Sequence, residues 1–170
     1  MRVMTEDVST QLITDEIALA AAREAFLASS ESAIFPVVVA YGSDRGNRFT
    51  LKAGATTTTA GVKIGGYWPG NTARGIPGHS STVVLLDQDT GRVGAIVEAS
   101  TANAYRTAAA DALAVQTLSH DDAKVLTIIG TGGQARHEAR AVARVRDLDL
   151  ILVIGRRAAA AKETAVDLRE

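Results

Sequence analysis

The stretch KVLTIIGTGGQAR, residues 124–136, decides the fold of the C-terminal part of the chain. Residues 124–129 are rich in β-branched side chains, which is typical of a buried strand. A glycine turn follows, and then a helix predicted over about 134–146. A second strand over 148–154 and a last helix from about Ala158 complete a β-α-β-α order. This order is the first half of a Rossmann-type, doubly wound parallel sheet.

The turn itself fits the pattern G-x-G-x-x-A of dinucleotide-binding proteins. In that pattern the first glycine permits a tight turn, the second lets the backbone approach a pyrophosphate, and the alanine allows close packing of helix on strand. The phosphates would lie at the helix N-terminus, where unpaired N–H groups favour negative charge. The alternative is a strand–turn–helix that needs glycine only for its geometry. The predicted cofactor-binding residues of the turn are Gly130, Thr131, Gly132, Gly133, Gln134 and Ala135.

The end of the second strand bears on which dinucleotide would bind. An acidic residue there would bind the ribose 2′-hydroxyl and favour NAD. This chain has Gly155, Arg156 and Arg157 instead. Two guanidinium groups can bind a 2′-phosphate through paired hydrogen bonds, so we expect NADPH, with NADH or NAD as the other options. The alternative is that both arginines form the solvated start of the next helix.

The residues before this half-domain predict a mostly antiparallel sheet with a helix. The helix is expected over 5–30, with a cap at Thr14 or Asp15, and a helix capped by Ser100 or Thr101 should connect the two parts. The predicted domains are 1–100, an α+β domain; 101–122, the connecting helix; and 123–170, the partial Rossmann domain. The expected strands and turns are a strand over 33–42, strands over 48–54 and 61–68, a loop over 69–78 and a hairpin over 81–99 that turns at 89–91.

Composition narrows the class of protein. The chain has 170 residues, a net charge of −1 and no cysteine. The near-zero charge gives no basic field for nucleic acid or anionic membranes, and the missing cysteines exclude disulfides and thiolate metal sites. The three histidines are far apart in sequence, so no metal site is expected. No signal peptide or membrane-spanning window is present, and a cytoplasmic protein is expected.

Two basic residues stand in unusual surroundings. Lys63 lies within the apolar strand AGVKIGG, where a lysine needs a partner unless it lies on an edge strand and reaches water. Arg106 lies in an alanine-rich helix, where its guanidinium can either bind a carboxylate or form a surface salt bridge. The pattern around each residue leaves both alternatives open.

The order of these motifs resembles that of the ornithine cyclodeaminase/μ-crystallin family, over nearly the whole chain. The similar stretches are 61–91, AYRTAAADALA and KVLTIIGTGGQA. The resemblance implies an NAD(P)-dependent protein that is a homodimer through a substrate-binding N-terminal domain. Members of the family have chains about twice this length, so we expect residues 1–170 to be an N-terminal part without turnover of its own.

The resemblance also assigns roles to residues. Lys63 matches the active-site lysine that faces the substrate nitrogen and carboxylate, and Arg106 matches the arginine that binds the carboxylate. Arg48 is a looser match to a second carboxylate-binding arginine. His79 and Thr107 fall where members of the family approach the cofactor, and Arg156 with Arg157 match the adenosine-ribose site.

The function implied first is NADPH-dependent reduction of a cyclic imino acid, such as Δ1-pyrroline-2-carboxylate or a related ketimine, to the L-amino acid. The pair of arginines, in place of an acid, favours this over ornithine cyclodeamination with bound NAD. Two further alternatives are a μ-crystallin-like protein that binds NADPH and a small ligand, and a fragment without function.

Overall fold

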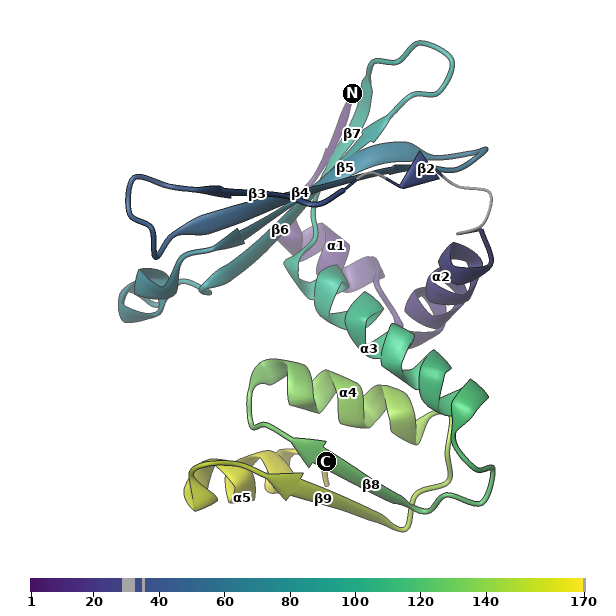
Figure 1. The fold of residues 1–170 in the computed structure, drawn as a ribbon, viewed down its shortest axis with the longest axis vertical. Helices are drawn as coiled ribbons and strands as arrows, with labels where there is room; N and C mark the ends of the chain where they lie inside the picture. The colour runs from purple at the N-terminus through teal and green to yellow at the C-terminus, as the bar shows by residue number, and fades with distance from the viewer. Residues whose placement is uncertain (29–32, 35, 170) are drawn as a thin grey trace. The chain divides into compact units, whose positions relative to one another are not determined.

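We describe a computed structural model of the chain, covering residues 1–28, 33–34 and 36–169. Strands predominate up to β7, and helices and strands alternate from α3 onward (Figure 1). The elements are β1 (Arg2–Met4), α1 (Glu6–Leu12), α2 (Asp15–Ala28), β2 (Ala33–Ile34), β3 (Val38–Tyr41), β4 (Arg48–Ala55), β5 (Ala60–Tyr67), the 3₁₀ helix η1 (Pro69–Arg74), β6 (His79–Leu86), β7 (Val93–Glu98), α3 (Ser100–Leu118), β8 (Val125–Ile129), α4 (Gly133–Ala143), β9 (Leu150–Ile154) and α5 (Ala158–Asp167).

The chain divides into two compact units. The first consists of Met1–Ile13 and Ala25–Asn103, and the second of Thr14–Glu24 and Ala104–Glu170. Helices α2 and α3 each contribute residues to both units. The first unit is an α+β structure, and the second contains the β-α-β-α segment. The predicted α/β fold class is therefore confirmed.

The first unit is built on a seven-stranded sheet in the order β1-β7-β6-β5-β4-β2, with β3 also paired to β4. All neighbouring strands are antiparallel except β1, which runs parallel to β7. The hairpin between β6 and β7 turns at the predicted residues, where the Asp87 carboxylate accepts hydrogen bonds from the N–H and hydroxyl of Thr90. Strand β5 lies between β4 and β6, so the interpretation of Lys63 as an edge-strand lysine is wrong.

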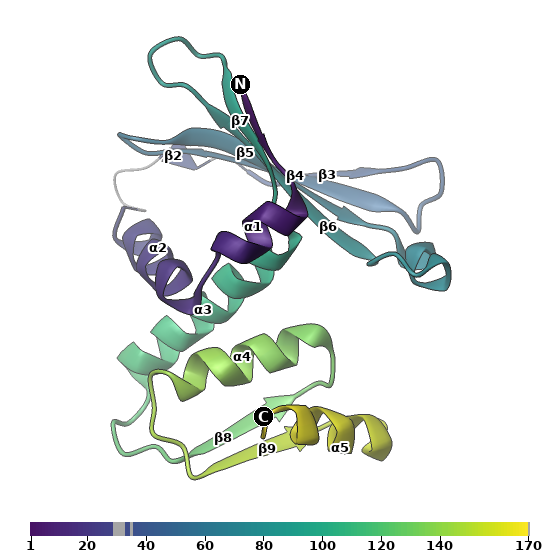
Figure 2. The ribbon, with the colours of Figure 1, turned by 180° about the vertical axis from the view of Figure 1, so that it is seen from behind.

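Helix α1 runs beside the start of α3 in both views of the molecule (Figures 1 and 2). The Glu6 carboxylate accepts hydrogen bonds from the backbone N–H groups of Ser100 and Thr101, at 2.9 and 2.7 Å. Burial raises the pKa of Glu6, but these hydrogen bonds outweigh burial and lower the pKa below its ordinary value. A residue far away in sequence therefore caps α3, and the predicted cap at Ser100 or Thr101 is wrong.

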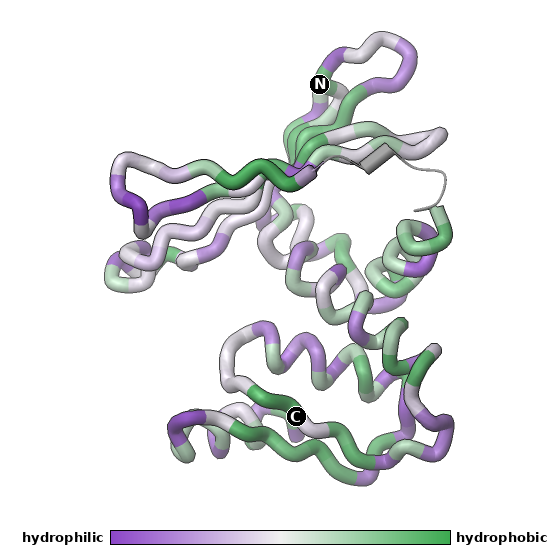
Figure 3. The backbone as a smooth tube through the Cα atoms, viewed as in Figure 1, coloured by the Kyte–Doolittle hydropathy of each residue, from purple (hydrophilic) through white to green (hydrophobic). Residues whose placement is uncertain are grey.

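The second unit contains the parallel pair β8 and β9, with α4 and α5 packed on one face. Ile128, Ala135 and Ala139 form the core of this packing, with Leu126, Ile151 and Leu168 against it. The other face carries the alternate residues of both strands, which apart from Thr127 are exposed apolar side chains: Val125, Ile129, Leu150, Leu152 and Ile154. The hydrophobic colouring of β8 and β9 is visible in Figure 3.

The end of α3 within this unit is also held by a side chain from elsewhere. The guanidinium of Arg146, which is almost fully buried, donates hydrogen bonds to the carbonyls of Val115, Gln116 and Ser119. A cation at a helix C-terminus satisfies carbonyls that have no partner within the helix.

The structure refines two predicted elements. The first predicted helix is two helices, because the chain is extended at Ile13, and the Thr14 hydroxyl accepts a hydrogen bond from the N–H of Ile17 in α2. The loop over 69–78 contains η1, which is followed by Gly75 with φ of 70°. Residues 29–30 of the first predicted helix and residue 35 of the first predicted strand lie outside the described residues.

Candidate functional site

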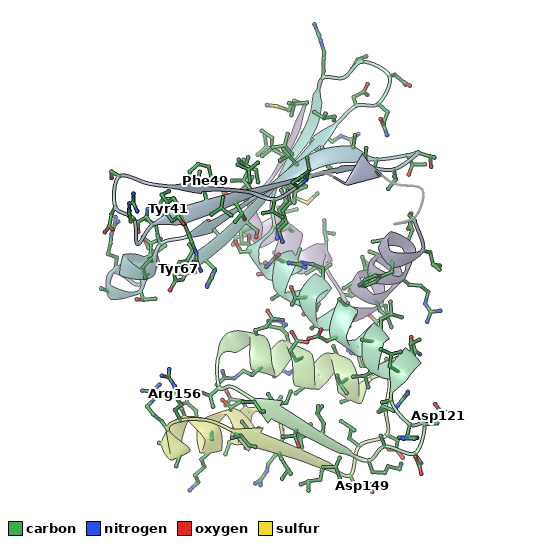
Figure 4. All side chains as sticks on the ribbon, in the orientation of Figure 1. Tyr41, Phe49, Tyr67, Asp121, Asp149 and Arg156 are labelled. Carbon is green, nitrogen blue, oxygen red and sulfur yellow. The ribbon has the colours of Figure 1, made fainter. Side chains whose placement is uncertain are left out.

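A pocket of about 860 Å³ lies at the carboxyl ends of β8 and β9. Ligands of open α/β sheets bind at this end of the strands. Figure 4 shows Arg156 at this end of the pair, whereas Asp121 and Asp149 lie at the opposite end. The lining residues are Ile129, Gly130, Thr131, Gly132, Ile154, Gly155, Arg156 and Arg157.

The glycine turn leaves room for a ligand at its backbone. Gly130 has φ of 134°, a conformation that L-residues rarely adopt, so glycine is required for the turn. A Cβ atom added to Gly132 or Gly133 would have no neighbour within 4 Å. Helix α4 begins at Gly133 and no side chain caps it. Its first N–H groups can therefore bind an anion, and this arrangement fits the pyrophosphate of a dinucleotide.

The residues that follow β9 form the other side of the pocket from the glycine turn. Arg156 and Arg157 are exposed, and none of the described residues that line the pocket is acidic. The residue before them, Gly155, could not carry a side chain without movement, because its Cβ would lie 2.5 Å from Cγ2 of Thr131. Gly155 thus lets the end of β9 approach the glycine turn, a role that sequence reasoning did not assign.

The last two residues of the turn are used in packing. Gln134 donates hydrogen bonds through its amide nitrogen to the Ala104 carbonyl, at 3.2 Å, and to Oε1 of Glu138, at 2.6 Å. Ala135 is buried in the core between α4 and β8. Neither residue, nor Gly133, is among the lining residues of the pocket. Their contribution to a cofactor site would be to hold the turn in place.

In the first unit, the structure brings Lys63 together with a residue that sequence reasoning missed. The half-buried Lys63 lies in the middle of β5, and its Nζ donates a hydrogen bond of 2.6 Å to Oδ1 of Asn103 on α3. The amide holds the ammonium group without adding a negative charge. The signal in the sequence was a polar residue three positions before Arg106, which places both on one face of a helix.

A second group of predicted residues meets at one end of the same sheet. The guanidinium carbon of Arg48 lies 5.0 Å from the centre of the Tyr67 ring, and that ring lies 4.6 Å from the His79 ring. The three residues are register partners across β4, β5 and β6. The contact between Arg48 and Tyr67 is a cation–π interaction, which fixes the guanidinium at the sheet surface.

The other two predicted residues lie on α3 in the second unit. Arg106 is exposed and Thr107 is half-buried. Tyr105, the residue before them, contacts the His137 ring with ring centres 5.1 Å apart.

The described part of the chain shows no cluster of three metal-binding side chains. Within the same residues, no helix combines the length and hydrophobicity that crossing a bilayer requires.

A carboxyl group near the glycine turn has an unusual proton affinity. Burial is the main cause that raises the pKa of Glu138; a hydrogen bond from Gln134 lowers it, and the neighbouring Asp111 carboxylate raises it, to about 7. Its Oε2 is buried and has no hydrogen-bond partner among the described residues. The folded state thus prefers the protonated form.

We therefore expect stability to depend on pH through Glu138. Because the pKa is raised from 4.5 to about 7, its stabilising effect is complete below pH 4.5 and is lost as the pH rises through 7. Solvent screening reduces the effect to about 1 kcal/mol. Glu138→Gln should raise the melting temperature at pH 8 but not at pH 5, whereas the exposed Glu163→Gln should change neither. Equal melting curves for Glu138→Gln and wild type at pH 8 would contradict this assignment.

Comparisons with known proteins agree with the geometry. The model of the ornithine cyclodeaminase/mu-crystallin family matches residues 1–170. Iminosuccinate reductase of Paracoccus denitrificans is 37% identical over 156 residues, which cover 89% of this chain and 49% of that protein. The chain thus spans about half the length of this curated relative.

Solved structures show the same fold. The structure of the Paracoccus enzyme in complex with NAD+ superposes with a TM-score of 0.89 at 34% identity, over 99% of this chain and 55% of that chain. Δ1-pyrroline-2-carboxylate reductase of Thermococcus litoralis, in complex with NADH and L-proline, gives 0.89 at 26% identity, over 99% and 53%. An archaeal alanine dehydrogenase dimer with bound NAD gives 0.92 at 26% identity, over 99% and 53%. The chain belongs to the ornithine cyclodeaminase/mu-crystallin family.

Proposed function

We propose that the protein reduces an imino acid to an amino acid with a nicotinamide cofactor. The pocket at the carboxyl ends of β8 and β9 carries this proposal, because it combines an uncapped helix start, an open glycine backbone and two arginines. The solved relatives with NAD+ or NADH bound support the same cofactor class.

Each candidate residue of the chain would then have its own role in the reaction. A bound cofactor would supply hydride to the imine carbon. Arg106 binds the carboxylate beside the C=N bond and orients the substrate. Lys63, held by Asn103, stands at the substrate nitrogen, where its ammonium group balances charge and delivers a proton. Arg48, fixed on Tyr67, is the second carboxylate-binding residue, and His79 and Thr107 approach the cofactor.

The substrate is an α-imino acid, and relatives suggest two kinds. Δ1-pyrroline-2-carboxylate is the cyclic imino acid that the family resemblance implies, and a relative that acts on it matches this chain. Iminosuccinate is the acyclic substrate named for the Paracoccus relative. The test is consumption of NAD(P)H by the natural protein that contains residues 1–170, with either compound. Formation of proline or aspartate is expected; no consumption with either would refute the proposal.

The cofactor is NADPH in our proposal, because Arg156 and Arg157 line the pocket where an acid would exclude a 2′-phosphate. Replacing both with glutamine should weaken NADPH binding by about 10-fold to 100-fold, the effect of losing charge-assisted hydrogen bonds, and leave NADH binding nearly unchanged. Calorimetric titration of both cofactors measures this difference.

Gly132→Ala serves as the comparison for this experiment. Its Cβ has open space in the absence of ligand, so the variant should fold normally but bind both cofactors more weakly. If the double arginine variant keeps the NADPH preference, the 2′-phosphate is bound elsewhere.

We also propose a homodimer through the sheet of the first unit. One face of this sheet carries a continuous set of apolar side chains that are partly or fully exposed: Val3, Val38, Phe49, Leu51, Val62, Ile64, Val84 and Ile96. An apolar patch of this extent is typical of an interface. The archaeal alanine dehydrogenase relative is a dimer, which supports the proposal.

A further inference from the structure

The face of the sheet that carries Lys63 is polar and cationic. Side chains alternate between the two faces of a strand, and register partners in neighbouring strands share a face. The registry of β4, β5 and β6 therefore places Lys52 and Arg48 on the same face as Lys63. The remaining residues of these strands on that face are Thr50, Gly54, Gly61, Gly65, Tyr67, His79, Ser81, Val83 and Leu85.

Lys52 is the direct partner of Lys63 across β4 and β5. Residues opposite each other in antiparallel strands have Cβ atoms about 5 Å apart, so the two side chains leave the sheet side by side. The next pair along the strands confirms that partners share a face, because a Cβ on Gly65 would lie 3.1 Å from Oγ1 of Thr50. Lys52 itself is exposed and has no hydrogen bond or ion pair within the described residues.

The positive charge of this face can be complemented by more than one carboxylate. Like charges directly opposite each other destabilise a sheet, and β4, β5 and β6 place no aspartate or glutamate on this face to offset them. The proposed imino acid brings one carboxylate beside its C=N bond. That carboxylate would leave the ammonium group of Lys52 without an opposite charge.

We infer that Lys52 is a specificity-determining residue that binds a second carboxylate, so that the substrate is an imino dicarboxylic acid. This inference rests on the proposed function, and it separates two substrates that the proposed function leaves open. A cyclic monocarboxylate such as Δ1-pyrroline-2-carboxylate has no group for Lys52 to bind. A four-carbon imino dicarboxylate has a carboxylate two bonds from the imine carbon, within the span of two adjacent lysine side chains.

The test uses the reverse reaction, in which an amino acid and NAD(P)+ give the imino acid, NAD(P)H and a proton. L-aspartate and L-asparagine have nearly the same shape and differ by the charge of the side chain. The natural protein containing residues 1–170 should oxidise aspartate with a kcat/KM about 10-fold to 100-fold above that for asparagine, as expected for a charge-assisted hydrogen bond. Lys52→Gln should remove this preference by lowering the value for aspartate alone.

Two further variants and one further substrate complete the test. Lys52→Arg should restore much of the preference for aspartate. Arg92→Gln removes one positive charge from the β6–β7 turn of the same unit and should leave the preference unchanged. Oxidation of L-proline in preference to aspartate, or an equal loss for both amino acids in Lys52→Gln, would overturn the inference while leaving imine reduction intact. If no amino acid is oxidised and no imino acid reduced, the proposed function itself fails.

If Lys52→Gln does not fold, the ratio of the kcat/KM values for aspartate and asparagine in the wild-type protein still tests the inference. A ratio near one would overturn the inference, and a ratio of about 10 or more supports it.

Discussion

Lys63→Gln is expected to lower kcat/KM for imine reduction by about 10²-fold to 10⁴-fold, the range for losing a positioned proton donor. The ammonium group is held by Oδ1 of Asn103 at 2.6 Å in the middle of β5. Glutamine keeps a hydrogen-bond donor at this place but has neither the charge nor the proton. Steady-state kinetics with NAD(P)H and the imino acid measure the loss.

Cofactor binding separates this effect from a folding defect. The pocket proposed for the dinucleotide lies in the second unit, whereas Lys63 belongs to the first, so the variant should bind NAD(P)H as the wild type does. Lys124→Gln is the matched control, because Lys124 is a half-buried lysine, as Lys63 is, and its ion pair is with the exposed Asp147. Turnover of Lys63→Gln close to that of Lys124→Gln would remove Lys63 from the reaction.

Arg106→Ala should mainly weaken substrate binding, with a loss in kcat/KM equivalent to about 2–5 kcal/mol, as for truncation of one partner of a desolvated ion pair. The reason is that the planar guanidinium binds a carboxylate through two hydrogen bonds and fixes the pose of the C=N group. The loss should appear as a higher KM for the imino acid, while the affinity for NADPH should change little.

Arg140→Ala provides the control for this variant, since Arg140 is an exposed arginine on α4 that does not line the pocket. Arg106→Lys tests the geometry of the group, because lysine keeps the charge without the two parallel donors. An unchanged kcat/KM in Arg106→Ala would exclude Arg106 from the substrate site.

Local patterns in the sequence were sufficient to predict the segment from β8 to α5. Each step there depends on neighbouring residues: β-branched residues for β8, the positive φ of Gly130 for the turn, and alanine at position 135 for packing. Predicted and observed bounds differ by a few residues at most. The motifs also indicated the family, which the comparisons confirm.

Contacts between distant residues could not be read from local patterns. The cap of α3 comes from Glu6, and β1 pairs in parallel with β7, although each is far from its partner in sequence. The contact of Lys63 with Asn103 needs the antiparallel registry and the start of α3 together. The close approach of Gly155 to Thr131 needs the parallel registry of β8 and β9. The residue types indicated which side chains can take part in the reaction. The contacts of these side chains with distant residues are set by the fold.

The most direct test of imine reduction follows the hydride itself. The natural protein containing residues 1–170 would be incubated with NADPH carrying deuterium in both positions at C4 of the nicotinamide, and with iminosuccinate or Δ1-pyrroline-2-carboxylate. Mass spectrometry would then locate the label in the product. Our account predicts one deuterium on the α-carbon of the amino acid. Amino acid product without the label, or no product while NADPH still binds, would contradict it.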